Sequence, residues 1–424
     1  MGIYDYIIVG GGISGLYMAY QLSITGKRIL VVESTNRWGG RIYTKNEKGV
    51  QFELGAARLS SKHTKIMSLL REFKLNDKLY ELSDNINFKI DGPKINYHNM
   101  LKEIVDNKKL YTKKYLESIN ILQLCIDILG FESAKYFQHK FGYDSEFFHL
   151  NAYIALKSFN KDLFSINNIY YTLQSGLSSI IDCLVKHLES CNNVKLKLET
   201  NVTDLGKNFI QKGKKNTYGN KIICCVPYYT LRMFSKCKGL DFIESITPVP
   251  LIRIYAIYPK DKHGKVWFHN LDRTITDNYI RNIIPIDSES GLIMISYTDG
   301  HYADMWNNIS KLGNKKLIEH LHNEIKKVLG KTIPKPSYIT SHYWSAGVHM
   351  WKPGINVKET YKKLLKPFTD EHIYIVNECY SKHQSWIEGC LDMCYDVLDL
   401  LDESFIREKQ KGGKPKQKSK IYTI

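Results

Sequence analysis

The pattern of apolar and polar residues is most regular at the start of the chain. A short apolar run over residues 4–9 leads into GGGISG at 10–15, and apolar residues then recur at helical spacing to residue 23. A second apolar run over residues 28–32 ends at Glu33. Short continuous apolar runs bounded by turn residues are typical of buried parallel strands. We therefore predict strand, glycine turn, helix and strand in that order.

Three later segments also carry a pattern. Apolar residues have helical spacing over 119–129, and residues 251–258 are patterned as a strand. The segment 207–220 is rich in Lys, Gly and Asn, which predicts a hairpin loop. No internal repeat is found along the chain.

Composition places the chain among folded proteins with more than one domain. Of its 424 residues, 43% are hydrophobic, so the chain can bury a large core and is too long for one ordinary compact domain. The charged share of 24% is average and excludes an intrinsically disordered chain. With 60 Lys and Arg against 43 Asp and Glu, the net charge is +17, which favours anionic partners over a polycationic substrate.

Part of the positive charge lies at the C-terminus. Residues 404–424 form a basic tail that contains Gly and Pro, and we expect it to be a solvated extension. Any binding of nucleic acid is expected only through this tail.

The nine cysteines indicate a reducing environment. Their number is odd and no pairs recur at metal-ligand spacing, so we expect neither a disulfide framework nor a metal centre. The fourteen histidines show no HExxH pattern. No apolar run approaches the ~20 residues that span a bilayer, and the N-terminus lacks the pattern of a secretory signal. We expect a soluble, intracellular, cytoplasmic protein without a membrane partner.

The glycine string has the context of a dinucleotide-binding turn. Gly10 suits the tight turn, Gly12 the close approach of a pyrophosphate, and Gly15 the close packing of helix on strand. Ile13 and Ser14 complete the turn at the start of the predicted helix, where phosphates are favoured.

Acidic and basic residues follow at informative positions. Glu33 comes about twenty residues after the glycines, which suits a carboxylate that accepts hydrogen bonds from an adenosine ribose. Arg37, Gly39, Gly40 and Arg41 then indicate backbone close to phosphate, with a guanidinium available to it. The alternative is a glycine-rich surface turn followed by an unrelated acid.

With this second glycine set, which reads ExxxRxGGR from Glu33, the sequence resembles the flavin-containing amine oxidase family of monoamine, polyamine and L-amino-acid oxidases. The resemblance extends to about residue 402. The segments that support it are VQFELGAA at 50–57, YTLQSGL at 171–177, ETNV at 199–202, KIICCVP at 221–227, IYIVNE at 373–378 and WIEGC at 386–390.

The resemblance implies a site for FAD. Beyond both glycine motifs and Glu33, the implied cofactor contacts are Gly55, Ala56, Ala57, Arg58, Val202, Glu378, Trp386 and Ile387. Asn377 stands where the family carries a glycine before Glu378. The loop around His349 has no cysteine, so we expect FAD to be held without a covalent bond.

The resemblance also implies the fold, which is α/β with a Rossmann-like FAD-binding domain interleaved with an α+β substrate-binding domain. The FAD-binding domain is expected to comprise residues 1–75, 165–245 and 355–403. The substrate-binding domain is expected to comprise 76–164 and 246–354.

The implied substrate site contains two notable arginines. GAARLSSKH at 55–63 resembles the L-amino-acid oxidase version of this segment, in which Arg58 binds the substrate carboxylate. The alternatives are pairing of Arg58 with a surface carboxylate or with the FAD phosphates. Arg253 stands where the family usually carries a lysine that holds a water near flavin N5, and arginine cannot be tuned as lysine can.

Aromatic residues complete the implied site. Trp386 falls where the family places one aromatic wall of the substrate site, and His349 or Trp351 is a candidate for the opposite wall. The alternative is that these rings belong to the core.

The resulting hypothesis is an FAD-dependent oxidase of a small-molecule amine or L-amino acid. Hydride transfer to flavin N5 would give an imine, and O2 would be reduced to H2O2. The alternatives are a flavin desaturase or isomerase of the same fold, or a catalytically weak flavoprotein with a structural or nucleic-acid-associated role. The sequence leaves open whether the chain forms a homodimer.

Overall fold

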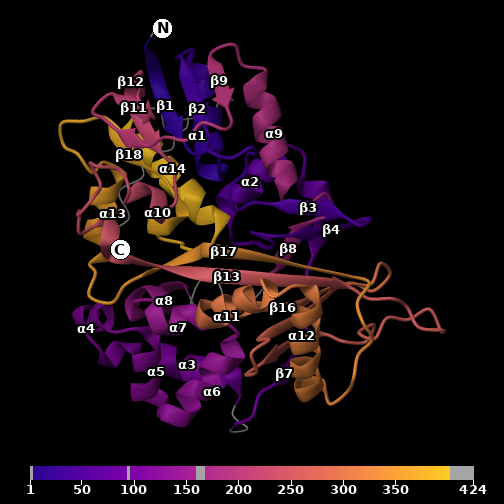
Figure 1. Cartoon of the computed structure of the whole chain (residues 1–424). Coiled ribbons are helices and arrows are strands. Elements are labelled where there is room, and N and C mark those ends of the chain that lie inside the picture. Colours follow the sequence, from indigo (N-terminus) through magenta and orange to yellow (C-terminus); the bar gives the residue numbers. More distant parts are fainter. Residues whose placement is uncertain (1–2, 93–95, 159–167, 402–424) are drawn as a thin grey trace.

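The computed structural model describes residues 3–92, 96–158 and 168–401 of the chain (Figure 1). The basic tail predicted at 404–424 lies outside the described residues. The fold is mixed α/β and is built around two larger sheets. No helix in the described ranges is both long and apolar enough to cross a membrane.

The first sheet contains the predicted N-terminal unit. Its strand order is β10-β11-β12-β1-β2-β9, with β18 paired to β12 on a separate branch. The pairs β1–β2, β2–β9, β1–β12 and β12–β18 are parallel, whereas β10 and β11 are antiparallel. The strands are β1 Tyr4–Val9, β2 Ile29–Val32, β9 Val194–Lys197, β10 Asp204–Leu205, β11 Phe209–Lys212, β12 Lys215–Cys224 and β18 Ile373–Ile375.

Helices α1 and α9 pack on this sheet, and α9 and α14 both pack against α1 (Figure 1). They are α1 Ile13–Leu22, α9 Ser178–Glu189 and α14 Ile387–Leu400. Every residue of α1 is buried, and apart from Gln21 its residues are apolar, aromatic or small, as expected of a helix enclosed on all sides. The predicted order of strand, glycine turn, helix and strand is confirmed.

The segment 207–220 differs from its prediction in extent. It does form a hairpin, but most of it is strand, since β11 and β12 pair from Phe209 with Tyr218 to Lys212 with Lys215. Only Gly213, with φ of +57°, and Lys214 form the turn. The strand residues are largely exposed and polar, so they lack the apolar alternation that signals a strand.

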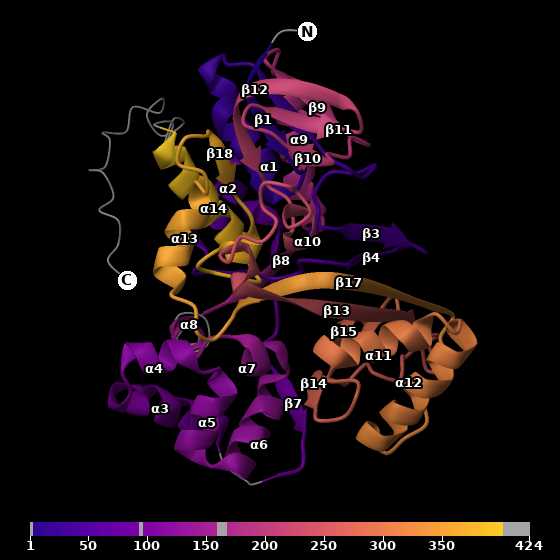
Figure 2. The same ribbon diagram turned by 60° about the vertical axis from the view of Figure 1, so that its left-hand side comes forward.

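The second sheet has the order β17-β13-β16-β15-β14-β7. Its strands are β7 Ile86–Lys89, β13 Ile246–Ile257, β14 Arg273–Thr276, β15 Asn282–Asp287, β16 Leu292–Asp299 and β17 Tyr338–Trp351. The long strands β13 and β17 cross the middle of the molecule (Figures 1 and 2). The strand expected over 251–258 is confirmed as part of β13.

Alternation along β13 separates the two faces of this sheet. Ile252, Ile254 and Ala256 join a buried apolar cluster with Trp306 and Leu317, which belong to helices α11 Gly300–Ser310 and α12 Asn314–Leu329. The intervening residues of β13 therefore project to the opposite face.

A group of helices adjoins the second sheet (Figure 2). These are α3 Tyr97–Asn107, α4 Lys113–Ser118, α5 Ile121–Leu129, α6 Phe131–Phe141, α7 Ser145–His149 and α8 Ala152–Ser158. The helix expected over 119–129 is confirmed, but it begins at Ile121 because Asn120 and Gln123 form a capping box at its start.

Shorter elements join these parts. They are β3 Thr44–Glu47, β4 Val50–Glu53, β5 Leu59–Ser60, β6 Leu79–Glu81, β8 Tyr170–Leu173, α2 Thr64–Glu72, α10 Tyr228–Leu231 and α13 Val357–Leu365. Strands β10 to β12, β1, β2, β9 and β18 come from the segments expected to bind FAD, and the second sheet comes from the other segments. The exact domain boundaries stay a prediction.

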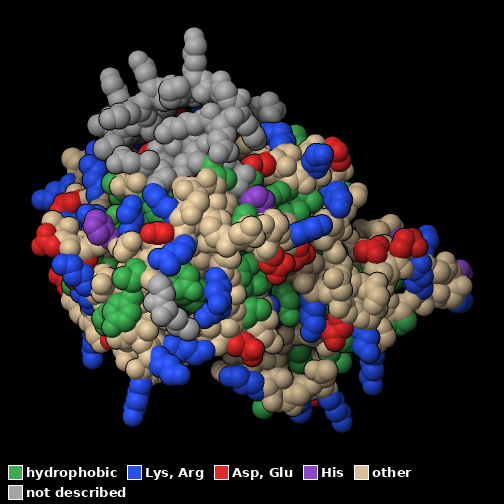
Figure 3. All heavy atoms as spheres, turned by 90° about the horizontal axis from the view of Figure 1, so that it is seen from above, with side chains coloured by type: hydrophobic (Ala, Val, Ile, Leu, Met, Phe, Trp, Pro, Cys, Tyr) green, Lys and Arg blue, Asp and Glu red, His purple; other side chains and the backbone are tan. Residues whose placement is uncertain are grey.

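The basic bias of the composition does not produce one basic patch on the face seen in Figure 3. On the part of that face drawn in colour, Lys and Arg side chains are spread out and Asp and Glu lie among them. Mixed charges of this kind are an ordinary solvated surface.

Candidate active site

The glycine turn lies between β1 and α1 and has the geometry of a phosphate cradle. Gly10 has φ of +109° and donates its N–H to the Val32 carbonyl at 2.8 Å. A Cβ on Gly15 would overlap the Gly10 carbonyl oxygen, so glycine is required there for the helix to approach the strand. A Cβ on Gly12 would meet no atom within 4 Å, so the space beside Gly12 is open to a ligand.

The start of α1 supports the same reading. Gly12 is its N-cap and supplies no side chain to cap the helix. Ile13 and Ser14, both buried, form the first turn. The N–H groups and the positive end of the helix dipole suit a phosphate here.

Glu33 directly follows β2 and lies beside this turn. One carboxylate oxygen accepts the Gly11 N–H at 2.7 Å, and the other accepts the Thr35 N–H at 2.9 Å. The backbone of residues 199 and 200 also runs alongside, because the Thr200 N–H donates to the Glu33 carbonyl at 2.8 Å. Val202, the residue expected near the adenine, follows in this segment and is buried.

The second glycine motif packs against the first. The Gly39 N–H donates to the Gly11 carbonyl at 2.8 Å, and Gly39 and Gly40 have φ of +107° and +57°. The Arg37 guanidinium donates to backbone carbonyls of the same loop, including that of Gly40 at 2.5 Å. The loop is therefore shaped by its own arginine, with glycine at both left-handed positions.

The expected segment beside the flavin adjoins this loop. The Ala56 N–H donates to the Arg41 carbonyl at 2.9 Å, and a Cβ on Gly55 would overlap that same carbonyl. Ala57 and Arg58 follow directly. The structure thus brings residues 10–15, 33–41, 55–58 and 199–202 to the carboxyl ends of β1 and β2, which is where α/β sheets bind ligands.

Arg41 connects this region to the C-terminal segment. Its guanidinium donates to Glu378 at 2.6 Å and to the Gly347 carbonyl at 2.9 Å. Glu378 also accepts the Ser385 N–H at 2.6 Å, so its carboxylate is satisfied on several sides. Burial would raise the pKa of Glu378, but the charges of Arg41 and His349 outweigh burial and lower the pKa to about 2.

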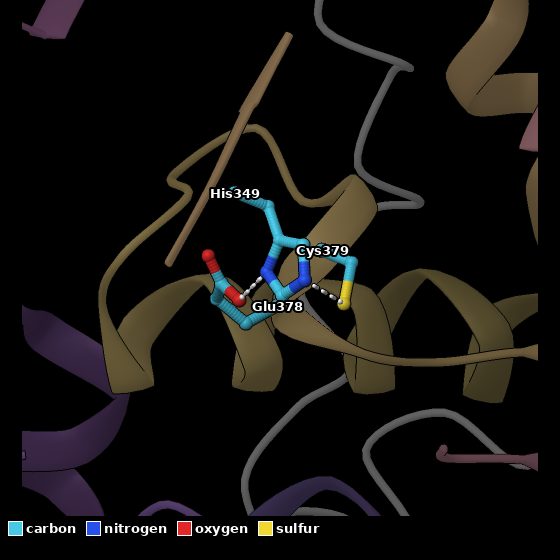
Figure 4. A group of neighbouring side chains, drawn as sticks. All are labelled: His349, Glu378 and Cys379. Atoms are coloured by element: carbon cyan, nitrogen blue, oxygen red, sulfur yellow. Dashed lines mark hydrogen bonds and ion pairs between the residues drawn. The ribbon is translucent and has the colours of Figure 1, made fainter. Parts of the chain in front are cut away.

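His349 lies between Glu378 and Cys379 (Figure 4). Its Nδ1 is 2.8 Å from Glu378 and its Nε2 is 3.4 Å from the Cys379 sulfur. Burial would lower the pKa of His349, but Cys379 and Glu378 raise it to about 9. The raised pKa favours the imidazolium form, in which both ring nitrogens donate.

These three buried side chains lie close enough together to raise the question of a metal centre. Glu378 and Cys379 contact different nitrogens of one imidazole, which point in opposite directions. A single ion can bind only one of those nitrogens. The arrangement is therefore a hydrogen-bonded chain from Arg41 through Glu378 and His349 to Cys379.

Trp386 lies at the N-cap of α14, directly before the buried Ile387. The described rings in contact with it are His63, at 4.7 Å between centroids, and Tyr170, stacked at 6.1 Å. Trp351 is fully buried and donates its indole N–H to the Ser381 carbonyl at 3.0 Å. The structure does not bring His349 or Trp351 into ring contact with Trp386, because both are enclosed in the core.

Arg58 is half-buried beside these rings. Its guanidinium carbon is 5.4 Å from the centroid of Tyr170 and 5.9 Å from that of Trp386. Among the described residues it pairs with no carboxylate, so the alternative of a surface ion pair is not observed there. Burial would lower the pKa of Arg58, but Tyr143, Tyr170 and Tyr297 raise it overall.

Arg253 projects from β13 to the face opposite α11 and α12. Its guanidinium donates to the Glu53 carbonyl at 2.8 Å and lies 4.8 Å from the centroid of Tyr297. The Tyr255 hydroxyl donates to the same carbonyl at 2.5 Å. Arg253 therefore faces the segment that leads to Gly55 and Arg58.

Several residues of this region carried no signal in the sequence. They are Tyr143, Glu146, Tyr170, Arg273 and Tyr297. They come from four separate parts of the chain, and a lone Tyr, Arg or Glu without a motif does not show which residues it will meet.

Comparison with known proteins agrees with this geometry. A family model described as "Flavin containing amine oxidoreductase" matches residues 13–392. Aplysianin-A from Aplysia kurodai is 22% identical over 512 residues, covering 92% of this chain and 89% of that protein. A solved structure of a putrescine oxidase A394C mutant has a TM-score of 0.76 at 15% identity, covering 95% of this chain and 99% of that one.

Closer matches are local. The (S)-6-hydroxynicotine oxidase of Paenarthrobacter nicotinovorans is 45% identical over 64 residues, 14% of this chain and 15% of that protein. An L-amino-acid oxidase of Trimeresurus stejnegeri is 37% identical over 90 residues, 19% of this chain and 17% of that protein. These two matches thus span less than a fifth of the relatives' own length.

The fold and the phosphate cradle together define a dinucleotide-binding protein. Because the family match spans most of the chain, the protein belongs to the flavin-containing amine oxidoreductases, and its cofactor is FAD. The open space at Gly12, the uncapped start of α1 and the left-handed glycines at 39 and 40 fit that cofactor.

Proposed function

We propose that the protein oxidises the amino group of an L-amino acid, with O2 as the final electron acceptor. One observation carries this proposal: the Arg58 guanidinium lies beside Tyr170 and Trp386 and pairs with no carboxylate of the described residues. A half-buried guanidinium presents a fork of donors that matches a carboxylate in two places. The substrate's α-carboxylate would supply the missing partner.

In this proposal Trp386 and Tyr170 form an aromatic wall that orients the substrate and excludes water. Arg253 would lie beside flavin N5, supported by its position on the face of β13 that adjoins Glu53. FAD would be held non-covalently by the two glycine motifs, Glu33, residues 55–58, Val202, Glu378 and Ile387. His349 and Trp351, both enclosed, would position Glu378 and the loop at 381 rather than touch the substrate.

When bound, the flavin supplies the acceptor for a hydride from the substrate's α-carbon. The neutral amine loses its proton as the C=N bond forms, and water then converts the imine to a 2-oxo acid and ammonium. The two electrons and two protons go to O2 as H2O2. Arg58 would hold the carboxylate throughout, so the α-carbon keeps its orientation.

A second candidate is a flavoprotein that reacts slowly with O2. Such a protein would pass its electrons to another acceptor or have a non-catalytic role. The arginine at 253 favours this candidate, because a permanent guanidinium cannot lose a proton as a lysine can.

The test uses the FAD-loaded protein with pooled L-amino acids and, separately, pooled amines. Flavin bleaching without O2 measures the reductive step, and peroxide release in air measures the oxidative step. Bleaching by amino acids with peroxide release supports the proposal. Bleaching without peroxide favours the second candidate, and bleaching by amines alone makes the protein an amine oxidase. No bleaching by either pool contradicts both oxidase readings.

A further inference from the structure

Three arginines meet around two tyrosines on the face of the second sheet that adjoins β4. We call this group the arginine–tyrosine cluster. Its members are Arg58, Tyr143, Arg253, Arg273 and Tyr297. The Arg253 guanidinium covers the ring of Tyr297 at 4.8 Å, and Tyr297 packs edge-on against Tyr143 at 5.4 Å between centroids. Tyr143 in turn lies with its hydroxyl 3.5 Å from an Arg273 nitrogen.

The sheet fixes this arrangement through its register. Arg253 on β13 is directly opposite Tyr297 on β16, and Tyr297 is opposite Asn282 on β15. Residues paired in this way project to the same face. The Asn282 side-chain oxygen accepts from Arg273 at 3.0 Å, and its nitrogen donates to the Gly142 carbonyl at 3.0 Å. Asn282 thus holds Arg273 in line with the other members.

None of these guanidinium groups forms an ion pair with a carboxylate of the described residues. Arg253 is held by the Glu53 carbonyl oxygen, and Arg273 by Asn282 and Tyr143. The Arg273 Nε is buried and has no hydrogen-bond partner. Burial lowers the pKa of Arg273, Tyr143 opposes this, and the nearby charge of Arg58 lowers it further.

Acidic groups lie nearby, but none of them forms an ion pair with these arginines. The Glu53 carboxylate, which lies in the field of Arg253, accepts the Thr44 hydroxyl at 2.9 Å and the Leu177 N–H at 2.7 Å instead. Burial, together with Asp299 and Asp144, raises the pKa of Glu146 to about 8 although Arg58 opposes the shift. Glu146 is therefore mostly protonated at neutral pH. Asp144 is paired with the buried Arg281 at 2.9 Å, and Asp299 accepts the N–H groups of Asp144 and Ser145.

Buried or half-buried positive charges without counterions are costly, and they are found where a ligand of opposite charge binds. One α-carboxylate can engage Arg58 but leaves Arg273 unpaired. A diamine is disfavoured, since its second ammonium would approach three guanidinium groups and one largely neutral acid. An acidic side chain offers a second carboxylate at the end of a short carbon chain.

We propose that the substrate of this site is a dicarboxylic amino acid, whose α-carboxylate binds Arg58 and whose side-chain carboxylate binds Arg273. The oxidation of the amino group in this proposal rests on the proposed function. The binding of a second carboxylate at Arg273 does not depend on it. Arg273 is then the residue that sets specificity, while Asn282 and Tyr143 position it. Losing one charge-assisted hydrogen-bonded pair costs about 1.5–3 kcal/mol, which is about 10- to 150-fold in affinity.

The test measures binding to the FAD-loaded protein by calorimetry, with glutarate as a diacid and butyrate as a monoacid. Neither probe has an amino group to oxidise, so the readout does not depend on turnover. We expect glutarate to bind at least about tenfold tighter than butyrate. Arg273→Gln should remove that advantage and leave butyrate within about threefold, and Arg273→Lys should retain part of it.

Arg71→Gln is the matched control. Arg71 is exposed on α2, and its substitution removes the same charge at a position outside the cluster. It should leave both affinities unchanged. The proposal is overturned if glutarate and butyrate bind equally, or if Arg273→Gln weakens both to the same extent while the melting temperature is kept. Tighter binding of putrescine or lysine than of glutarate also overturns it. If Arg273→Gln does not fold, the ratio of glutarate affinity to butyrate affinity in Arg273→Lys decides the test.

A substrate panel separates this inference from the proposed function. If L-leucine bleaches the flavin faster than L-glutamate does, and glutarate has no advantage, the oxidase function stands and the second anion site fails. If glutarate binds selectively but no amino acid bleaches the flavin, the anion site stands and the proposed function fails.

Discussion

Arg253 and Tyr297 lie directly opposite each other on β13 and β16, with the guanidinium carbon 4.8 Å from the ring centroid. The contacts that hold this guanidinium are neutral: the ring, the Tyr255 hydroxyl and the Glu53 carbonyl. Burial would lower the pKa of Arg253, but Tyr255 and Tyr297 raise it overall. The charge of Arg253 is therefore permanent at any pH at which the protein is folded.

A permanent charge at this position leads to a prediction about the two half-reactions. We expect anaerobic flavin reduction by a good substrate to outpace reoxidation by O2, because arginine replaces a group whose protonation can be tuned. Arg253→Lys should speed reoxidation and leave reduction within about threefold. Stopped-flow absorbance measures both rates, and an unchanged reoxidation rate in the variant would show that Arg253 does not act beside N5.

Arg58 should decide between amino acids and amines. We expect L-amino acids to reduce the flavin far better than the matching decarboxylated amines, since only the former carry the partner for the guanidinium. Arg58→Ala should erase this preference, at a cost of about 3 kcal/mol in kcat/KM for the amino acid. The rate with the amine serves as the internal control. Equal rates for both substrates in the unmodified protein would make it an amine oxidase.

The open space at Gly12 separates cofactor binding from folding. A Cβ there meets no protein atom, and the backbone has φ of −74°, so Gly12→Leu should fold. Its side chain would occupy the space of the pyrophosphate, and the purified variant should be colourless. Gly15→Ala should instead destabilise the protein, because its Cβ overlaps the Gly10 carbonyl. Flavin absorbance and melting temperature together distinguish the two effects.

The same experiment tests how FAD is held. The unmodified protein should be yellow and should release free FAD when it is denatured and filtered. Flavin that remains on the denatured chain would contradict non-covalent binding.

Most features of the cofactor-binding segments could be predicted from the sequence, because local backbone geometry dictates their residues. Gly10 and Gly39 need positive φ, Gly15 must admit a carbonyl, and Glu33 follows a buried strand. Each requirement restricts the residue type at one position, so it can be recognised in the sequence. Arg41 was singled out for phosphate, whereas its pairing with Glu378, 337 residues away, needed the structure.

Fewer residues of the substrate-binding segments could be predicted from the sequence. Arg273, Tyr143 and Tyr297 meet only because β14, β15 and β16 pair in a particular register. Register is set by turns and packing across the whole sheet, and no single residue records it. For the same reason, the expectation of a loop around His349 is wrong: residues 349 and 351 belong to the end of β17, and the structure encloses both side chains.

The chain from Arg41 to Cys379 leads to a prediction about pH and stability. The folded-state pKa of His349, about 9, lies above its ordinary value of 6.5, so His349 stabilises the fold fully below about pH 6.5. This contribution is lost as the pH rises through 9, and the shift corresponds to at most about 3–4 kcal/mol. Glu378, with its pKa lowered to about 2, contributes above its ordinary 4.5 and loses that contribution as the pH falls toward 2.

We therefore expect the urea midpoint of the FAD-loaded protein to be highest between about pH 4.5 and 6.5, as far as these two groups control it, and to fall between 6.5 and 9. His349→Gln should lower the midpoint at pH 6 and flatten its fall toward pH 9, because a neutral amide cannot supply the imidazolium that Glu378 binds. His320→Gln is the matched control, since His320 is exposed on α12 and should leave the profile unchanged. A variant at 349 whose profile keeps the full slope of the unmodified protein would mean that His349 is not protonated in the folded state.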